Sequence, residues 1–251
     1  MLTKNEIKYI RLLQEKKHRD IENRFVVEGT KWLQDLLQWQ PEWIDTLYTT
    51  ESWITSHGGG FNKQKIRIIA DFELEKISAL SHPAPVIAIL YKPEKEKLPF
   101  SQHQWNIVLD GIQDPGNLGS IIRIADWFGL PAIWCSTDCA DAFNPKVVQA
   151  TMGSLCRVIV QYIDLENWLT GTNLPVYMSG MEGKSLFDIH EKTGILVIGS
   201  EGKGVRKEIA SKATHHITIP RLGHAESLNA AVATGIMVAK LTAKGEPSKE
   251  H

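Results

Sequence analysis

Three segments of the sequence combine glycine with polar side chains in a pattern that could bind and act on a ligand. The first runs from Asp110 to Arg123, the second from Gly199 to Gly204, and the third from Ile219 to Asn229. Each follows a short apolar run that is typical of a buried strand. Ligands of open α/β sheets bind beyond the carboxyl ends of the strands, so these three segments form the candidate site.

The first segment opens a helix whose apolar residues are spaced to face a core. That spacing leaves Ser120 and Arg123 on the opposite side. An arginine one turn inside a helix, beside a glycine-rich turn, is well placed to bind a phosphate. For this segment alone, a solvated Arg123 and an Asn117 that merely caps the helix are equally good interpretations.

The second segment has three glycines in six residues and carries Glu201. Such a loop lets backbone groups approach a ligand closely. Its order is Gly-x-x-Gly-x-Gly, which is not the dinucleotide-binding fingerprint, so a nicotinamide or flavin enzyme is disfavoured. A glycine-rich connection without a function remains an alternative.

The third segment leads into the last helix. Ser227 is a natural N-cap for that helix. Asn229 places a primary amide in the first turn of an apolar helix, where it must find partners, and such partners are often functional. There is no Gly-x-Ser-x-Gly motif of a serine hydrolase, and the nine histidines show no metal-ligand spacing, so we expect no metal.

The elements that position these segments alternate between strands and helices. Continuous apolar runs separated by helical patterns predict a largely parallel sheet that is covered on both faces. The last helix, 227–243, is apolar nearly all round, which predicts burial against a second subunit. The predicted strands lie at 107–109, 132–134, 158–160, 176–178, 195–198 and 217–219.

Residues 1–91 show a shorter alternation that predicts a separate small α/β/α sandwich. Residues 92–103 are charged, bounded by proline and poor in apolar side chains, which is typical of a linker. We therefore predict an N-terminal domain at 1–91 and a larger domain at 104–251.

Bulk composition limits the class of protein. The hydrophobic content of 43% is that of a soluble globular protein, and no apolar run approaches the roughly 20 residues that cross a bilayer. Charged residues, Lys4 first among them, interrupt any signal peptide near the start. Three cysteines do not make a disulfide framework. We therefore expect a cytoplasmic protein that does not enter a membrane.

The net charge of −1 argues against a protein that binds nucleic acid by phosphate neutralisation alone. The first 24 residues nevertheless carry seven basic and four acidic side chains. Lys16, Lys17 and Arg19 are the densest part of this patch and are candidate RNA contacts. A solvated helix face is an equally good interpretation.

Together and in this order, the three segments resemble the three motifs of the SpoU (TrmH) family of RNA ribose 2'-O-methyltransferases, within the SPOUT superfamily. The resemblance covers the whole C-terminal part, and Arg24–Gly29 more weakly resembles a ribosomal-protein-L30e-like substrate-binding domain. Arg221 departs from the pattern, because an apolar residue is common there. The matching stretches are Asn117–Ala125, Ile198–Gly204, Ile219-Pro220 and Ser227-Leu228-Asn229.

This resemblance implies an α/β domain with a deep trefoil knot, which is an exception to the rule against threaded chains. It also implies S-adenosylmethionine as the cofactor, RNA as the substrate and a homodimer. For the cofactor pocket it indicates Gly199, Gly202, Ile219, Pro220 and Leu228. For catalysis it indicates Asn117, Arg123, Glu201, Ser227 and Asn229.

The resemblance leaves the target RNA open. The extra N-terminal domain favours ribosomal RNA, and 23S rRNA above all, over transfer RNA. A non-catalytic RNA-binding relative and a methyltransferase that acts on a base are the competing functions. The role of Arg123 is also open: a guanidinium stays protonated, so it is expected to bind the RNA phosphate and stabilise an alkoxide, and any base role depends on that contact.

Overall fold

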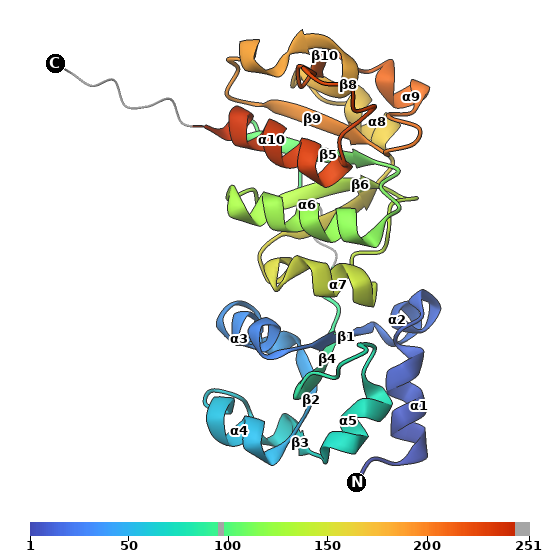
Figure 1. The fold of residues 1–251 in the computed structure, drawn as a ribbon, viewed down its shortest axis with the longest axis vertical. Helices are drawn as coiled ribbons and strands as arrows, with labels where there is room; N and C mark the ends of the chain where they lie inside the picture. Colours follow the sequence, from blue (N-terminus) through green and yellow to red (C-terminus); the bar gives the residue numbers. More distant parts are fainter. Residues whose placement is uncertain (95–97, 244–251) are drawn as a thin grey trace, which may run out of the picture. The chain divides into compact units, whose positions relative to one another are not determined.

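The computed structural model describes residues 1–94 and 98–243 (Figure 1). The described residues of Met1–Glu96 and Asp141–Arg157 form one compact unit, called here the N-terminal unit. Those of Lys97–Ala140 and Val158–His251 form a second, the C-terminal unit. Residues 95–97 of the predicted linker and residues 244–251 of the predicted second domain lie outside the described residues.

The N-terminal unit is built on a four-stranded sheet in the order β1-β4-β2-β3. β4 runs antiparallel to both of its neighbours, and β3 runs parallel to β2. Helices α1 and α5 lie on one side of the strands, and α3 and α4 on the other (Figure 1). The elements are α1 (Lys4–Leu12), α2 (Lys16–Glu22), β1 (Arg24–Glu28), α3 (Thr30–Trp39), β2 (Ile44–Thr49), α4 (Glu51–His57), β3 (Ile66–Ile68), α5 (Asp71–Ile77), β4 (Val86–Tyr91), α7 (Pro145–Thr151) and the 3-10 turns η1 (Pro41–Trp43), η2 (Lys63–Lys65) and η3 (Ser154–Cys156).

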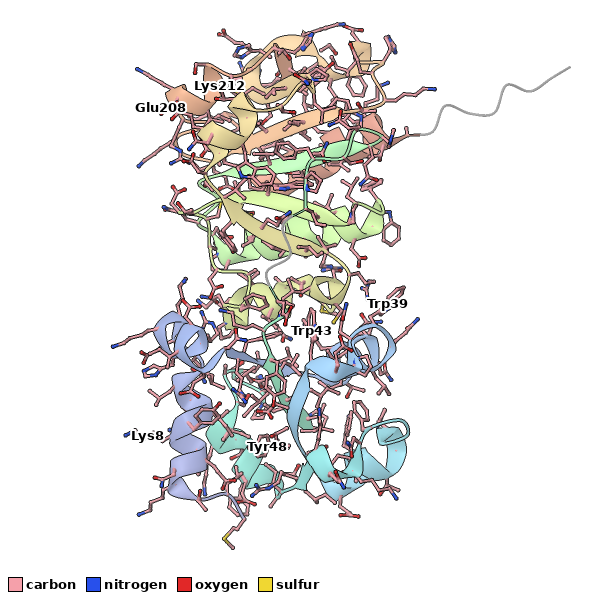
Figure 2. All side chains as sticks on the ribbon, turned by 180° about the vertical axis from the view of Figure 1, so that it is seen from behind. Lys8, Trp39, Trp43, Tyr48, Glu208 and Lys212 are labelled. Carbon is pink, nitrogen blue, oxygen red and sulfur yellow. The ribbon has the colours of Figure 1, made fainter. Side chains whose placement is uncertain are left out.

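The core of this unit follows the alternation of the strands. Val26 and Ile89 face Ile10 of α1 and Leu74 of α5 in one buried cluster, because successive strand residues point to opposite faces. Polar side chains turn outward, as Lys8 does from α1 (Figure 2).

The segment Asp141–Arg157 packs with this unit although it is distant in sequence. The Nε1 of Trp32 on α3 donates a hydrogen bond of 2.9 Å to the carbonyl of Val148 on α7.

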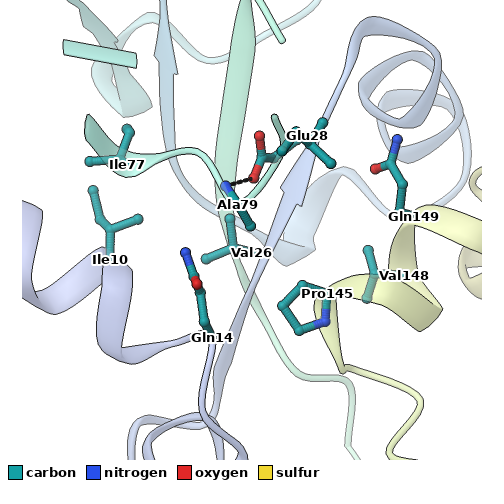
Figure 3. A pocket seen from close by; sticks show the side chains of 10 residues that line it. Ile10, Gln14, Val26, Glu28, Ile77, Ala79, Pro145, Val148 and Gln149 are labelled. Carbon is teal, nitrogen blue, oxygen red and sulfur yellow. Dashed lines mark hydrogen bonds between the residues drawn. The ribbon is translucent and has the colours of Figure 1, made fainter. Parts of the chain in front are cut away.

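A small pocket of the N-terminal unit has apolar walls that include Val26, Ile77 and Val148 (Figure 3). Its carboxylate, Glu28, is only 6% exposed and already accepts hydrogen bonds from the hydroxyl of Ser78 at 2.6 Å and the amide of Ala79 at 2.7 Å. These bonds stabilise the turn after α5. Among the described residues that line it, the pocket therefore offers no free charged group to a ligand.

The C-terminal unit contains a six-stranded sheet in the order β10-β8-β9-β5-β6-β7. All neighbouring strands run parallel, which confirms the predicted parallel sheet. The elements are β5 (Trp105–Asp110), α6 (Pro115–Trp127), β6 (Ala132–Ser136), β7 (Ile159–Ile163), α8 (Leu165–Thr170), β8 (Val176–Ser185), η4 (Leu186–Asp188), β9 (Gly194–Gly199), α9 (Lys207–Ala210), β10 (His215–Thr218) and α10 (Ala230–Thr242).

Helices cover both faces of this sheet. Val108 and Val197 pack with Leu165 of α8 and Ile209 of α9 on one face. On the other face α6 and α10 pack against each other, and α10 contacts β9 (Figure 1). The chain thus returns from the edge strand β10 to the middle of the sheet. This path fits the trefoil knot that the resemblance implies.

Two helix starts differ from the predictions. The last helix begins at Ala230, and its N-cap is Asn229, so the predicted cap role of Ser227 is wrong. The physical reason is that an asparagine caps as well as a serine, and the Oδ1 of Asn229 accepts the amides of Ala231 and Val232. Helix α6 is capped by Asp114 instead of Asn117, whose side chain is left available for other partners.

Candidate functional site

The three predicted segments leave the same edge of the parallel sheet. β5 and β9 are neighbours, and the last residue of β5, Asp110, is paired in register with the last residue of β9, Gly199. β10 ends at Thr218, and the third segment then runs back to α10. All three segments are therefore available to one site at the carboxyl ends of the strands.

Glu201 connects the three segments. Its Oε1 accepts hydrogen bonds from the Nδ2 of Asn117 at 3.0 Å, the Nδ2 of Asn229 at 2.6 Å and the backbone amide of Ala230 at 3.1 Å. The Nδ2 of Asn229 also donates to the Oδ1 of Asn117 at 2.7 Å. These three side chains, called here the amide–carboxylate network, are three of the five residues predicted for catalysis.

The start of α10 supplies the electrostatic support for this network. The Oδ1 of Asn229 accepts the amides of Ala231 at 3.0 Å and Val232 at 3.2 Å. Glu201 receives the neighbouring amide of Ala230, so its negative charge faces the positive end of the helix dipole. The amide of Asn229 is thereby oriented with its nitrogen towards the carboxylate.

The other two predicted catalytic residues lie outside the network. Arg123 is exposed on α6, and among the described residues it forms no ion pair. Ser227 is exposed in the segment before α10. Both are accessible to a ligand, but the structure does not place either of them in contact with Glu201.

The glycines predicted for the cofactor pocket shape the second segment. Ser200 and Gly204 exchange backbone hydrogen bonds of 3.2 and 2.8 Å, so the segment folds into a tight hairpin with Glu201 near its tip. A Cβ on Gly199 would lie 2.2 Å from the carbonyl carbon of Gly204, so only glycine fits at the base of this hairpin. A Cβ on Gly202 would meet nothing within 4 Å, which leaves its backbone open to a ligand.

The third segment is open along its whole length. Residues 220–229 are all exposed, and Leu228 has 45% of its surface accessible. Within the described residues, no backbone amide between Arg221 and Leu228 donates a hydrogen bond. Ile219 and Pro220 stand at the start of this free stretch, directly after β10.

Side chains that the sequence did not single out hold the first segment in place. The Oγ of Ser136 accepts the amide of Gly111 at 2.9 Å, and the Sγ of Cys139 accepts the amide of Ile112 at 3.2 Å. A hydrogen bond from Cys135 lowers the pKa of Cys139 to about 7. These contacts join separate strand ends, so no local sequence signal could have indicated them.

Asp110 and Arg206 form an ion pair that the sequence did not indicate. Hydrogen bonding to Asp110 raises the pKa of Arg206, so this guanidinium keeps its charge. In the part of the chain that the structure describes, no three or more His, Cys, Asp or Glu side chains form a group that could hold a metal ion.

The predicted RNA contacts of the N-terminal unit fall into two classes. Lys16 has 66% of its side chain exposed beside Asp20, and Lys17 is exposed as well. Arg19 is only 1% exposed. Its guanidinium is bound to Asp141 at 2.6 Å and to backbone carbonyls of the turn before α2. Arg19 therefore stabilises the N-terminal unit and is too buried to contact RNA, so the predicted RNA contact at Arg19 is wrong.

Comparison with known proteins agrees with this arrangement. The SpoU rRNA Methylase family matches residues 104–239, and the MRM3-like substrate binding domain matches residues 4–88. The 23S rRNA (guanosine(2553)-2'-O)-methyltransferase RlmP of Bacillus subtilis is 30% identical over 239 residues, which cover 93% of this chain and 94% of that protein.

Solved structures show the same fold. A TrmH-family protein from Porphyromonas gingivalis is 35% identical, with a TM-score of 0.86, over 96% of this chain and 98% of its own. An AdoMet-bound rRNA methyltransferase from Sinorhizobium meliloti is 29% identical, with a TM-score of 0.85, over 96% of this chain and 95% of its own. With its three motifs at one sheet edge and its family match over more than half its length, the chain belongs to the SpoU rRNA methylase family.

Proposed function

We propose that this protein transfers the methyl group of S-adenosylmethionine to the 2'-hydroxyl of one ribose in 23S rRNA. The observation that carries the proposal is the amide–carboxylate network, in which Glu201 joins side chains from all three family motifs. The similarity to RlmP over nearly the whole chain supports ribosomal RNA as the substrate class.

The residues at the sheet edge fit this cofactor. Adenine and methionine groups need apolar surface and main-chain donors, and the stretch from Arg221 to Leu228 leaves its amides free among the described residues. Leu228 adds exposed apolar surface. Bound there, S-adenosylmethionine would supply an electrophilic methyl group on a sulfonium. The residues that would hold it are Gly199, Gly202, Ile219, Pro220 and Leu228.

The protein's own side chains would position the ribose and stabilise charge. Arg123 is exposed and free of ion pairs among the described residues, so it is available to bind the RNA phosphate and stabilise the developing alkoxide. An arginine side chain offers five N–H donors and no acceptor, so the role proposed for Arg123 is that of a phosphate and alkoxide ligand. Glu201 and Asn229 would orient the ribose, and Ser227 lies just before Asn229 in the sequence.

The N-terminal unit would bind the RNA that surrounds the target. The match to a substrate-binding domain over residues 4–88 supports this role. Lys16 and Lys17 are exposed and would contact phosphates. Replacing both with glutamine should reduce the salt dependence of RNA binding, because each phosphate contact contributes about −0.7 to −0.9 to the slope.

A homodimer is part of this proposal. Val232 and Ile236 of α10 have 52% and 37% of their surface exposed, and Trp127 of the adjacent α6 has 84%. Exposed apolar side chains on two helices that contact each other support an interface with a second subunit.

We also expect the protein to act in the cytoplasm, in keeping with the proposed ribosomal RNA substrate. In the described residues, no helix has both the length and the apolar character that a membrane crossing requires.

Mapping of 2'-O-methyl groups in total RNA, with and without the protein, tests the proposed function. We expect one ribose of 23S rRNA to lose its methyl group when the gene is removed. A change in transfer RNA alone, or a methylated base detected by nucleoside mass spectrometry, would contradict the proposed substrate. Failure to bind S-adenosylmethionine in calorimetry would favour a non-catalytic RNA-binding relative.

A further inference from the structure

The hairpin that carries Glu201 is held at its base by an ion pair between the buried carboxylate of Asp110 and the half-exposed guanidinium of Arg206. Asp110 is 1% exposed, and its Oδ2 accepts the backbone amide of Arg206 at 2.7 Å. Its Oδ1 accepts the Nε of Arg206 at 2.7 Å and lies 2.5 Å from a terminal guanidinium nitrogen. Both carboxylate oxygens are thus bound to a single residue, through its main chain and its side chain.

The positions of these two residues explain what the pair can control. Asp110 ends β5 directly opposite Gly199, where the hairpin begins, and Arg206 stands just after Gly204, where the hairpin ends. The pair therefore closes the second segment onto the strand that leads to α6. Since α6 carries Asn117, the ion pair fixes the hairpin relative to a partner of Glu201.

The burial of Asp110 favours a single conformation of the hairpin. A buried carboxylate that loses its partner is strongly destabilising, so the hairpin cannot shift without exposing Asp110 or leaving it unpaired. Arginine suits this task because its planar guanidinium binds a carboxylate through two nitrogens at once. Asp138 lies 3.6 Å from the same guanidinium and adds a second, more exposed carboxylate.

We propose that Asp110 and Arg206 are positioning residues for methyl transfer, which hold Glu201 where it accepts both side-chain amides of the network. Neither residue needs to touch RNA or cofactor for this role. The inference rests on the proposed function for its kinetic readout, but the geometry of the hairpin can be measured without any reaction.

Steady-state methylation of a 23S rRNA fragment tests the kinetic part. We expect Arg206→Gln to lower kcat about tenfold and to change the KM for RNA less than about twofold, because a misplaced orienting group affects the reacting geometry more than binding. Arg206→Lys should recover part of kcat, since the charge is kept and the fork is lost. Lys207→Gln, which removes a neighbouring exposed charge, should match the wild type.

A double-mutant cycle with Glu201→Gln shows whether the pair acts through Glu201. If it does, adding Arg206→Gln to Glu201→Gln should cost less than about a further twofold in kcat, because residues that act as a unit are not additive. The inference would be overturned if the two losses of kcat multiply in the double variant. A wild-type kcat for Arg206→Gln alone would overturn it as well.

Hydrogen exchange of the free protein separates this inference from the proposed function. The amide of Gly204, which donates to Ser200 at 2.8 Å, should exchange at least about threefold faster in Arg206→Gln and at the wild-type rate in Lys207→Gln. Unchanged exchange in Arg206→Gln would contradict the inference even if the enzyme is active. A wild-type protein that methylates no RNA would overturn the proposed function alone. If Arg206→Gln does not fold, Arg206→Lys should show smaller changes of the same sign, and their absence would count against the pair.

Discussion

The side-chain amide of Asn229 donates a hydrogen bond to the Oδ1 of Asn117 at 2.7 Å across 112 residues of sequence. The same amide nitrogen donates to Glu201 at 2.6 Å, so one NH₂ group links the start of α10 to two other elements. Its carbonyl oxygen meanwhile caps the helix. Asn229 therefore has two separable roles, one in stability and one at the site.

Replacing Asn229 with serine should separate these roles. A serine hydroxyl still caps α10, so the free energy of unfolding should change by less than about 0.5 kcal/mol. The amide donors to Glu201 and Asn117 are lost, so methyl transfer should fall by about 10²-fold. Methylation kinetics and chemical denaturation measure the two effects. Asn229→Ala should lose the same activity and, in addition, about 1 kcal/mol of the free energy of unfolding. Equal stability of the serine and alanine variants would contradict the capping role.

Arg123 should be needed for turnover and not for cofactor binding. We expect Arg123→Ala to reduce kcat by about 10²-fold, since it removes a charge that stabilises the developing alkoxide. Arg123→Lys should also stay well below the wild type, because a lysine lacks the planar fork. Calorimetry should give an unchanged affinity for S-adenosylmethionine. Near-wild-type turnover of Arg123→Lys, with an unchanged pH dependence, would remove Arg123 from its proposed role.

The exposed apolar face of α10 should control the oligomeric state. Val232→Asp combined with Ile236→Asp places two charges on that face and should convert a dimer to a monomer in sedimentation experiments. Ile68→Asp is the matched control, because Ile68 is 50% exposed on the N-terminal unit. A wild-type protein that sediments as a monomer, or a control that also dissociates, would contradict the proposed interface.

Asp20 should make the stability of the N-terminal unit depend on pH. Hydrogen bonds from Lys16 and Lys92 lower the pKa of Asp20 from 3.8 to about 2. Because the folded pKa lies below the unfolded one, the stabilisation is present above 3.8 and is lost as the pH falls towards 2. Asp20 is 45% exposed, so we expect Asp20→Asn to cost only about 0.5 kcal/mol at pH 7.

Urea unfolding at several pH values checks this prediction. The difference between Asp20→Asn and the wild type should shrink steadily as the pH falls below 3.8. Asp188→Asn, a substitution of an exposed carboxylate in the C-terminal unit, provides the control. If the difference in the free energy of unfolding stays constant down to the lowest pH measured, Asp20 acts through something other than its charge.

The candidate site could be predicted largely from local sequence because its motifs lie at strand ends. Apolar runs identified the strands, and glycine with polar residues marked the loops after them. The same reasoning assigned the helix cap to Ser227, since serine and asparagine are both good caps and local propensity cannot choose between them. The sequence indicates Arg19 as an RNA contact, because its charge is visible in the sequence and its burial is not.

By itself, the sequence determined the alternating α/β character, the three motif segments and the family to which they belong, because these depend on residue type and short-range spacing. Only the tertiary structure decided that Glu201 binds Asn117 and Asn229, that Arg19 is buried against Asp141, and that Asp110 fastens Arg206. Each of these contacts joins residues far apart in the chain. Their geometry follows from strand order and helix packing, which no local pattern specifies.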